Sequence, residues 1–357
     1  MIKSCYIHIP FCKNICSYCD FCKMYYNKDF VDKYLLSLEK EINLYYKNDL
    51  LNTLYIGGGT PSCLDEISLK KLFKIINIFR LNKTYEFTFE CNIEDINEKL
   101  LIFLKENKVN RISIGLQSFN KKYIEFMNRK YLNKKEITDK INLVKKYFNN
   151  INIDLIYGIN NETLKELQEE VDSFINLDVN HISLYSLILE DNTILKTKKY
   201  KEIDDDLNRK MYDYIRKTLK KNNYIHYEIS NFSKKGYMSK HNLCYWNNDN
   251  YYGFGLGSSG FIDNIRYTNT RSLNSYINGN YRYYEEKIDK KRNMEYEMIL
   301  NLRKIKGISK KNFYKKYNIN IKDVFDVSKL NENKYYFYIP KKYLFVENYI
   351  LCDFILD

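Results

Sequence analysis

The chain of 357 residues has no alanine and very little proline, tryptophan or histidine. It holds 3 Pro, 1 Trp, 4 His and only 12 Gly, whereas Tyr alone occurs 36 times. The abundant residues have AT-rich codons and the rare ones have GC-rich codons, which indicates a very AT-rich genome. Because rare residues stand out in such a composition, their positions are informative.

Long apolar runs are also missing, which excludes a typical membrane-spanning helix. Residues 1–5 lead directly into a predicted strand, so we expect no signal peptide and a cytoplasmic protein. The nine cysteines are then metal ligands or buried thiols rather than disulfides. The net charge of +13 comes from lysines spread along amphipathic helices, which favours a solvated surface over a nucleic-acid-binding patch.

Three of the cysteines form a compact motif. Cys12, Cys16 and Cys19 have the spacing C-x3-C-x2-C and follow an apolar strand predicted at 5–10. Three thiolates on one loop can hold three irons of a [4Fe-4S] cluster and leave the fourth iron open to another ligand. The alternatives are a zinc site completed by Cys22 and a chance group of buried thiols.

Strands and helices alternate along most of the chain. The predicted strands are 5–10, 51–56, 85–90, 111–119, 150–158, 181–187 and 227–230, and the predicted helices are 28–48, 65–80, 95–107, 120–128, 133–147, 162–176 and 204–222. This order predicts an α/β fold with a parallel sheet, either a barrel or a doubly wound open sheet. Helices near 295–305 and at 309–316 and a β-ribbon at 334–352 predict a small second domain, which divides the chain into 1–285 and 286–357.

Polar and flexible residues gather at the carboxyl ends of the predicted strands, where parallel barrels place their chemistry. Gly57, Gly58 and Gly59 form a turn after one strand, and Glu90, Gln117 and Asp154 end or nearly end three others. Glycine lets backbone approach a ligand closely, although such a turn is also an ordinary strand-to-helix connection. A carboxylate at a strand end suits an ammonium group or ribose hydroxyls, but it can equally be a helix cap.

A second dense segment covers residues 230–262. His241 and the only tryptophan, Trp246, lie in the run His-Asn-Leu-Cys-Tyr-Trp, and four glycines follow within residues 253–260. Glycine-rich backbone beside aromatic residues and a histidine suits a flat apolar ligand with a metal, such as haem. The alternative is a core tryptophan and a hydrogen-bonded loop histidine.

Together these motifs resemble the radical SAM (S-adenosylmethionine) superfamily, and within it the oxygen-independent coproporphyrinogen III oxidase family. The resemblance is strongest over 6–262 and implies a partial (β/α)6 barrel with a small C-terminal helical and winged domain. It implies a [4Fe-4S] cluster on Cys12, Cys16 and Cys19. It also implies that SAM contacts Tyr6, Gly58, Gly59, Thr60, Glu90, Gln117, Arg129, Asp154 and Ile188.

Three features place the chain nearest the HemW-type haem-chaperone branch of that family. Asp20 and Phe21 follow the third cysteine, where the oxidase has a further C-x-C cysteine, and the given sequence begins almost at the first predicted strand, so we expect no counterpart of the oxidase's N-terminal extension. The segment from His241 to Trp246 matches the HNxxYW motif of the chaperones, in which the histidine is implicated in haem binding. This branch implies a protein that binds haem and passes it to a membrane-associated acceptor, with an electron donor if SAM is cleaved.

Three alternatives remain at this point. The first is a coproporphyrinogen III oxidase, which decarboxylates two propionates. The others are a radical SAM enzyme with an unrelated substrate and a binding module that has lost activity.

Overall fold

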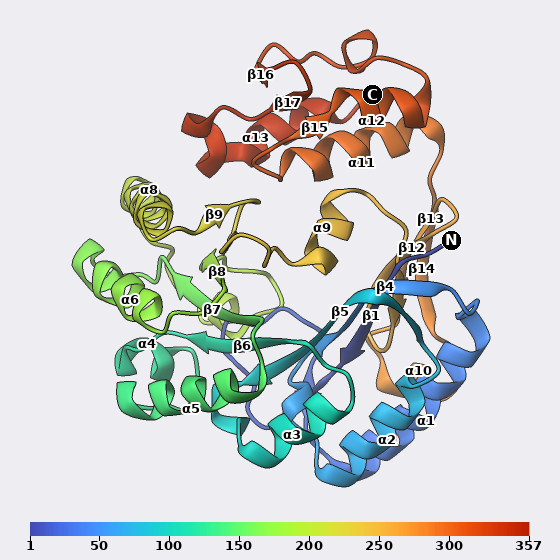
Figure 1. Cartoon of the computed structure of the whole chain (residues 1–357), viewed down its shortest axis with the longest axis vertical. Helices are drawn as coiled ribbons and strands as arrows, with labels where there is room; N and C mark the ends of the chain where they lie inside the picture. The colour runs from blue at the N-terminus through green and yellow to red at the C-terminus, as the bar shows by residue number, and fades with distance from the viewer. Residues whose placement is uncertain (357) are drawn as a thin grey trace.

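The structure, a computed structural model, describes residues 1–356 and is built around a nine-stranded sheet (Figure 1). The strand order is β11-β1-β4-β5-β6-β7-β8-β10-β9. All strands from β11 to β8 in this order run parallel, while β10 and β9 are antiparallel at one end. The bounds are β1 Ser4–Ile9, β4 Leu50–Gly58, β5 Arg80–Asn92, β6 Arg111–Gln117, β7 Ile151–Tyr157, β8 His181–Ser186, β9 Ile225–His226, β10 Asn231–Ser233 and β11 Tyr252–Phe254.

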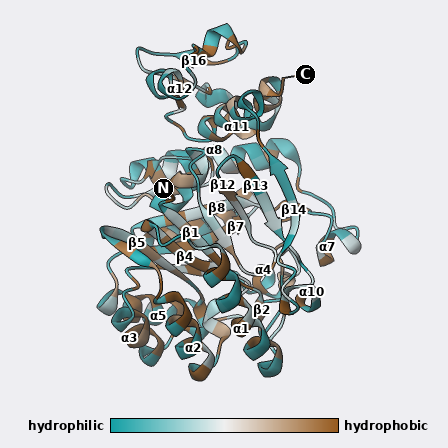
Figure 2. Ribbon diagram, turned by 90° about the vertical axis from the view of Figure 1, so that its right-hand side faces the viewer, coloured by the Kyte–Doolittle hydropathy of each residue, from teal (hydrophilic) through white to brown (hydrophobic). Residues whose placement is uncertain are grey.

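Helices connect the parallel strands and lie along the outer side of the curved sheet (Figure 1). Their bounds are α1 Lys28–Tyr45, α2 Glu66–Ile76, α3 Glu98–Glu106, α4 Lys121–Phe126, α5 Lys134–Tyr147, α6 Leu164–Asn176 and α8 Asp205–Lys221. The short helix α7 Ile194–Thr197 lies instead beside the loop of Cys16 and Cys19, where the Leu195 N–H donates to the Ser17 carbonyl. Side-chain caps fix where the helices begin: Thr163 and Glu166 form a reciprocal capping box at α6. Figure 2 shows apolar and polar residues on the same helices, as expected for helices that bury one face.

The predicted α/β fold with a parallel sheet is confirmed. Within residues 1–356, the edge strands β11 and β9 do not pair with each other, so the sheet is an open, partial barrel. The predicted strand at 227–230 is wrong. Residues 227–230 form the connection between the antiparallel strands β9 and β10, because the chain reverses there instead of crossing over.

The last predicted ribbon, at 334–352, is only partly correct. Strand β17 (Tyr336–Tyr338) pairs with β15 (Ile308–Ser309) and β16 (Asn331–Glu332). Beyond Pro340 the chain is helical, with a 3-10 helix at Lys341–Val346 and α13 at Glu347–Leu351. Proline favours the start of a helix, and Pro340 stands directly before this one. Its helix-starting preference outweighs the β-propensity of the aromatic residues that follow.

Several elements after β10 were not predicted. They are α9 Lys240–Trp246, β11, a separate sheet of β12 Ser259–Ile262, β13 Ile265–Asn269 and β14 Arg282–Lys287, and α10 Leu273–Ile277. The C-terminal layer then consists of α11 Lys290–Leu302, α12 Lys310–Tyr317, α13 and the sheet β15-β17-β16. The predicted domain boundary at 285/286 falls within β14, and a separate C-terminal domain stays a prediction.

The C-terminal layer lies at one end of the molecule, beyond α9 and away from helices α1 to α3 (Figures 1 and 2). Helix α9 contacts both β4 and α11, so it lies between the sheet and this layer. Across the described chain, no helix is both long and apolar enough to cross a membrane.

Candidate functional site

One face of the parallel strands lines a cavity of about 350 Å³. Successive residues of a strand point to opposite faces of the sheet, and the lining residues alternate in the same way. On β5 to β8 the residues that follow this alternation are Glu90, Asn92, Arg111, Ser113, Gly115, Gln117, Asn152, Asp154, Ile156, Ser183 and Tyr185, and Cys91 and Ser186, near strand ends, also line the cavity. The residues between them, such as Phe89 and Ile114, are fully buried in the core. The sheet therefore has a polar face toward the cavity and an apolar face toward the helices.

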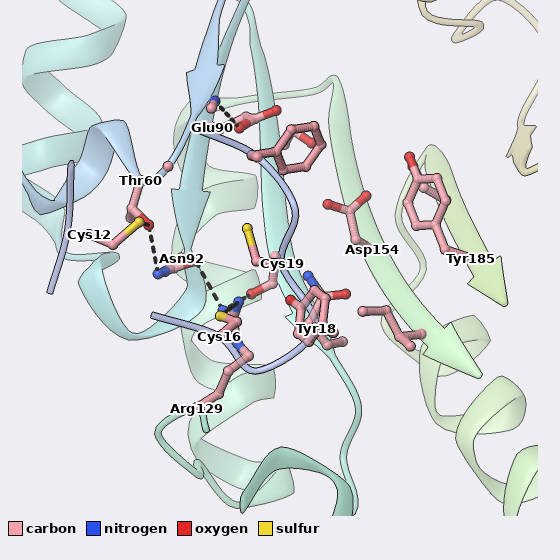
Figure 3. Close-up of a pocket in the computed structure, with 18 of the residues that line it drawn as sticks. Cys12, Cys16, Tyr18, Cys19, Thr60, Glu90, Asn92, Arg129, Asp154 and Tyr185 are labelled. Carbon is pink, nitrogen blue, oxygen red and sulfur yellow. Dashed lines mark hydrogen bonds between the residues drawn. The ribbon is translucent and has the colours of Figure 1, made fainter. Parts of the chain in front are cut away.

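The cysteine loop borders this cavity (Figure 3). Cys12 ends the short strand β2 (Phe11–Cys12), which pairs with β3 (Met24–Tyr25). The Thr60 hydroxyl donates to Cys12 Sγ at 3.5 Å, and Arg129 Nη1 donates to Cys16 Sγ at 3.7 Å. Burial raises the pKa of Cys12 to about 11 and also raises the pKa of Cys19. The thiols of Cys12 and Cys19 are therefore protonated at neutral pH, and a metal bound there would displace their protons.

The glycine-rich turn after β4 lets this loop and the sheet approach each other. A Cβ on Gly59 would lie 2.9 Å from Cys12 Sγ, and a Cβ on Gly57 would lie 2.6 Å from the carboxyl carbon of Glu90. Gly58 has φ +117°, a conformation that side chains disfavour. Larger residues would therefore push the cysteine loop and Glu90 away from the turn.

Glu90 is the carboxylate nearest the turn. It accepts hydrogen bonds from the Tyr55 hydroxyl at 2.6 Å and the Gly58 N–H at 3.0 Å. Burial raises the pKa of Glu90 to about 7, and the charge of Asp154 adds to this shift, while Arg111 opposes it. Burial raises the pKa of Asp154 as well. The cavity thus holds two carboxyl groups whose charge is sensitive to what binds between them.

Arg129 connects the cysteine loop to the sheet. Its Nη2 donates to the Gly115 carbonyl at 2.8 Å and to Asn92 Oδ1 at 3.0 Å. Asn92 in turn donates to the Thr60 hydroxyl at 3.3 Å. Figure 3 shows this chain of contacts running from Arg129 through Asn92 to Thr60 and Cys12. Two of the three cysteines are therefore tied to one hydrogen-bonded network.

Most of the predicted site residues lie around this cavity. They are Cys12, Cys16, Cys19, Gly58, Gly59, Thr60, Glu90, Gln117, Arg129, Asp154 and Ile188. Gln117 has φ +72°, a backbone conformation that is strained for a residue other than glycine. Ile188 is 63% exposed at the rim, beside the exposed Tyr185 and Phe21.

Tyr6 and His241 do not line the cavity. The Tyr6 hydroxyl bonds to His8 Nδ1 at 2.9 Å, and the Tyr6 ring lies 6.0 Å from the ring of Tyr55. His241 is 1% exposed, with Nδ1 2.8 Å from the Thr53 hydroxyl and Nε2 2.7 Å from the Tyr245 hydroxyl. Both ring nitrogens of His241 are therefore engaged within the protein.

Sequence reasoning missed several residues of the site, among them Asn92, Arg111, Tyr55 and Asn152. Asn92 lies two residues after Glu90, so strand alternation places it on the same face, and this signal was available. Arg111 begins a strand and looks like a surface cation, yet it is 2% exposed beneath the two carboxyl groups. Only the folded sheet brings the Arg111 charge close enough to act on Glu90.

The donor set fits an iron–sulfur cluster better than a single zinc ion. Among the described residues, no three His, Cys, Asp or Glu side chains are grouped as ligands of one ion. Each thiolate of a cubane binds a different iron, so its ligands need not converge on one point. The Cys22 thiol lies 4.0 Å from the Arg271 carbonyl and does not line the cavity, so it offers no fourth zinc ligand.

Comparison with known proteins identifies relatives along almost the whole chain. Residues 6–174 match the model of the radical SAM superfamily. A protein of Lactococcus lactis named "Heme chaperone HemW" is 38% identical over 332 residues, which cover 90% of this chain and 87% of that protein. A protein of Bacillus subtilis with the same name is 38% identical over 338 residues, which cover 91% of this chain and 89% of that protein.

A solved structure has the same fold. The coproporphyrinogen III oxidase HemN of Escherichia coli, described as a radical SAM enzyme, superposes with a TM-score of 0.86 at 19% identity. The match covers 99% of this chain and 90% of the oxidase chain. At this identity the likeness establishes the fold and not the reaction.

Proposed function

Because this chain belongs to the radical SAM superfamily and, within it, to the HemN/HemW-type family, we propose that it is a haem chaperone. In this proposal it binds a [4Fe-4S] cluster, SAM and haem, and it passes haem to an acceptor protein. The observation that carries the proposal is one cavity in which three cysteines meet the strand-end residues Glu90, Gln117 and Asp154. The relatives named as haem chaperones support the choice of branch.

Cys12, Cys16 and Cys19 would hold the cluster. When bound, the cluster supplies an iron with an open coordination position and, once reduced, an electron. The Thr60 hydroxyl and the Arg129 guanidinium stabilise thiolates at Cys12 and Cys16 through the hydrogen bonds described above. This loop lies beside the glycine turn, so a ligand of the open iron would also face Gly58 and Gly59.

The remaining cavity residues suit SAM. The backbone of Gly58, Gly59 and Thr60 would hold its methionine part, and ionised Glu90 would bind its ammonium group. The other proposed contacts are Gln117, Arg129, Asp154 and Ile188. Tyr6 would support the SAM site indirectly. Its ring packs beside Tyr55, and the Tyr55 hydroxyl donates a hydrogen bond to Glu90.

Haem binding is assigned to the region of α9, which contains His241. His241 as placed bonds to Thr53 through Nδ1 and to Tyr245 through Nε2, so coordination of iron by one of these nitrogens would require the hydrogen bond of that nitrogen to break. The further partners are a haem-accepting protein at a membrane and, if SAM is cleaved, an electron donor, with no nucleic acid. We place the protein in the cytoplasm.

The experiment that tests this function is a haem titration of the anaerobically reconstituted protein, followed by visible absorbance. We expect saturable haem binding, and we expect His241→Ala to weaken it. In parallel, the protein is incubated with reductant, SAM and coproporphyrinogen III. Formation of protoporphyrinogen IX would replace the chaperone assignment with that of an oxidase.

The cluster assignment has its own test and a matched control. Cys16→Ala should lose the cluster, because it removes one of three iron ligands, whereas Cys22→Ala should keep it, because Cys22 lies outside the cavity. Iron content and visible absorbance after reconstitution measure both variants. A cluster retained by Cys16→Ala, or lost only in Cys22→Ala, would disprove the ligand set.

A further inference from the structure

A series of buried hydrogen bonds leads from the cavity beside the cysteine loop to the start of helix α9. It begins at Asp154, whose Oδ1 accepts from Asn152 Nδ2 at 2.9 Å. Asn152 Oδ1 lies 2.6 Å from His181 Nδ1, and His181 Nε2 lies 2.7 Å from the Tyr227 hydroxyl. The Tyr227 hydroxyl oxygen accepts from the Ser239 N–H at 3.3 Å. Asp154 and Asn152 line the cavity, whereas His181, Tyr227 and Ser239 lie outside it, so the series connects the cavity to a distant element.

The members of this hydrogen-bond series are shielded from solvent. Asn152 is 2% exposed, Tyr227 is 5% exposed, and His181 and Ser239 are 0% exposed. A buried polar group that loses its partner is left unsatisfied, because solvent does not reach it. Each member therefore depends on the position of the next one.

The direction of every hydrogen bond in the series follows from its end at Asp154. Asn152 presents its amide nitrogen to Asp154, so its oxygen faces His181 and the proton of the ring lies on Nδ1. Burial lowers the pKa of His181 well below its usual value, so the ring is neutral and Nε2 accepts from the Tyr227 hydroxyl. With the Ser239 N–H behind Tyr227, all donors point toward Asp154.

Donors that share one direction polarise one another toward the final acceptor. A ligand that brings a positive charge or a hydroxyl group to Asp154 favours the ionised carboxylate. An ionised acceptor makes stronger hydrogen bonds than a neutral one. Binding at Asp154 therefore strengthens the bonds at His181 and Tyr227, although neither residue touches the ligand.

Ser239 is the residue at which α9 begins. Its hydroxyl caps the first turn of the helix, and its own N–H is held by the Tyr227 hydroxyl. The next two N–H groups, those of Lys240 and His241, both donate to Glu86 at 3.0 Å. Glu86 does not line the cavity, whereas the bond to Tyr227 continues into it. A displacement of the Tyr227 hydroxyl would therefore move the start of α9.

We propose that His181 and Tyr227 are positioning residues that couple ligand binding at Asp154 to the placement of α9. The proposal rests on the function proposed above, in which Asp154 contacts SAM and α9 belongs to the haem-binding region. SAM bound at Asp154 then tightens the series and holds the start of α9 toward His181 on β8. Because such coupling is reciprocal, a ligand that displaces α9 weakens SAM binding by the same factor.

The test uses Trp246, the only tryptophan of the chain, which is the last residue of α9 and reports on this helix by fluorescence. The full chain with its cluster reconstituted is titrated with SAM, and calorimetry gives the affinity. We expect SAM to change the emission of Trp246. Asp154→Asn should lose this change even at saturating SAM, because the series no longer ends on a charge. Tyr227→Phe should reduce the change and weaken SAM binding about threefold to tenfold.

Tyr224→Phe is the matched control, because it also removes one buried hydroxyl. Tyr224 is 3% exposed, and its hydroxyl donates to the Val179 carbonyl at 2.7 Å, outside the series. This variant should match the wild type in SAM affinity and in the fluorescence change. Thermal unfolding shows which variants fold. If Tyr227→Phe does not fold, His181→Asn takes its place, since asparagine keeps a donor near the position of Nδ1 and has no atom at that of Nε2.

Three results would overturn the coupling. They are SAM binding without a change in Trp246 emission, a full change in Asp154→Asn, and equal weakening of SAM binding by Tyr227→Phe and Tyr224→Phe. A different result identifies failure of the proposed function. If the reconstituted wild type binds no SAM in calorimetry, the SAM site itself is wrong, and the coupling falls with it.

Discussion

Glu90 combines a buried position with two donors that favour its ionised form. The Tyr55 hydroxyl and the Gly58 N–H stabilise the carboxylate, but burial and Asp154 act more strongly in the opposite direction. The balance leaves the pKa of Glu90 at about 7. A bound cation would reverse this balance by favouring the charged form.

The first prediction concerns the pH dependence of SAM binding. Below about pH 7 Glu90 is protonated and cannot attract an ammonium group, so SAM affinity should fall up to about tenfold per pH unit below that value. Glu90→Gln should bind SAM weakly and lose this pH dependence. Calorimetric titration between about pH 5.5 and about pH 7 measures both proteins. An affinity of the wild type that is constant over this range would contradict the proposed contact.

At the scale of elements, the predictable parts of the chain are those with regular periodicity. The helices and parallel strands up to β8 follow from apolar spacing, and the polar residues at strand ends follow from the alternation. The strand predicted at 227–230 is wrong because the chain reverses there between β9 and β10. This reversal depends on the pairing of β10 with β8, a contact between residues about 50 positions apart that no local pattern reveals. Strand β11 was missed because Tyr-Gly-Phe is too short to give a pattern and is fixed only by its pairing with β1.

The parts of the candidate site that could be predicted are those in which a single strand or loop contributes several residues. The cysteines and the glycine turn are local motifs, so spacing alone locates them. The burial of Arg111 and the hydrogen bond between His241 and Thr53 depend on contacts between elements far apart in sequence. No local pattern shows that His241 points toward the sheet and bonds to Thr53 on β4.

The second prediction concerns the turn after β4. Gly59→Ala would place a Cβ 2.9 Å from Cys12 Sγ and from the Phe11 carbonyl oxygen. We expect a folded protein whose cysteine loop is displaced and whose cluster content after reconstitution is greatly reduced. Gly279→Ala is the control, since φ is +86° there and no atom lies within 4 Å of the added Cβ.

Gly279→Ala should lower the free energy of unfolding by about 1 kcal/mol through backbone strain alone and keep the cluster. Iron analysis and urea unfolding separate the two effects. An unchanged cluster in Gly59→Ala would show that the turn does not set the position of Cys12.

At the scale of the whole molecule, buried carboxyl groups lie where the C-terminal layer meets the rest of the chain. Glu347 accepts from Arg303 Nη1 at 2.9 Å, but its Oε2 is buried without a hydrogen bond. Burial raises the pKa of Glu347 to about 8, and burial raises the pKa of Glu228 to about 7. The backbone at Glu228 also pairs with Lys304 of the C-terminal layer.

The third prediction follows from the sign of these shifts. The folded protein holds protons on these groups at pH values where the unfolded chain has released them, so the stabilisation is full below about pH 4.5 and is lost by about pH 8. The free energy of unfolding should therefore decrease over this range, by an amount on the order of 1 to 3 kcal/mol.

Glu347→Gln should make this decrease smaller, because an amide does not titrate. Urea unfolding of both proteins at a series of pH values gives the comparison, and the difference between them isolates Glu347 from other titrating groups. Equal slopes for the wild type and the variant would refute the role of Glu347.

Strand β1 leads into the cysteine loop and pairs with two strands, β4 and β11. These two strands are synthesised at very different times. β4 follows within 50 residues or so, but β11, which pairs Cys5 with Tyr252, leaves the ribosome only after about 250 residues have been made. Until then one edge of β1 has unpaired backbone groups and can associate with other chains. Strand β1, which leads into the cysteine loop, is thus among the last parts of the sheet to be completed, and slow translation would prolong the time during which its edge is exposed.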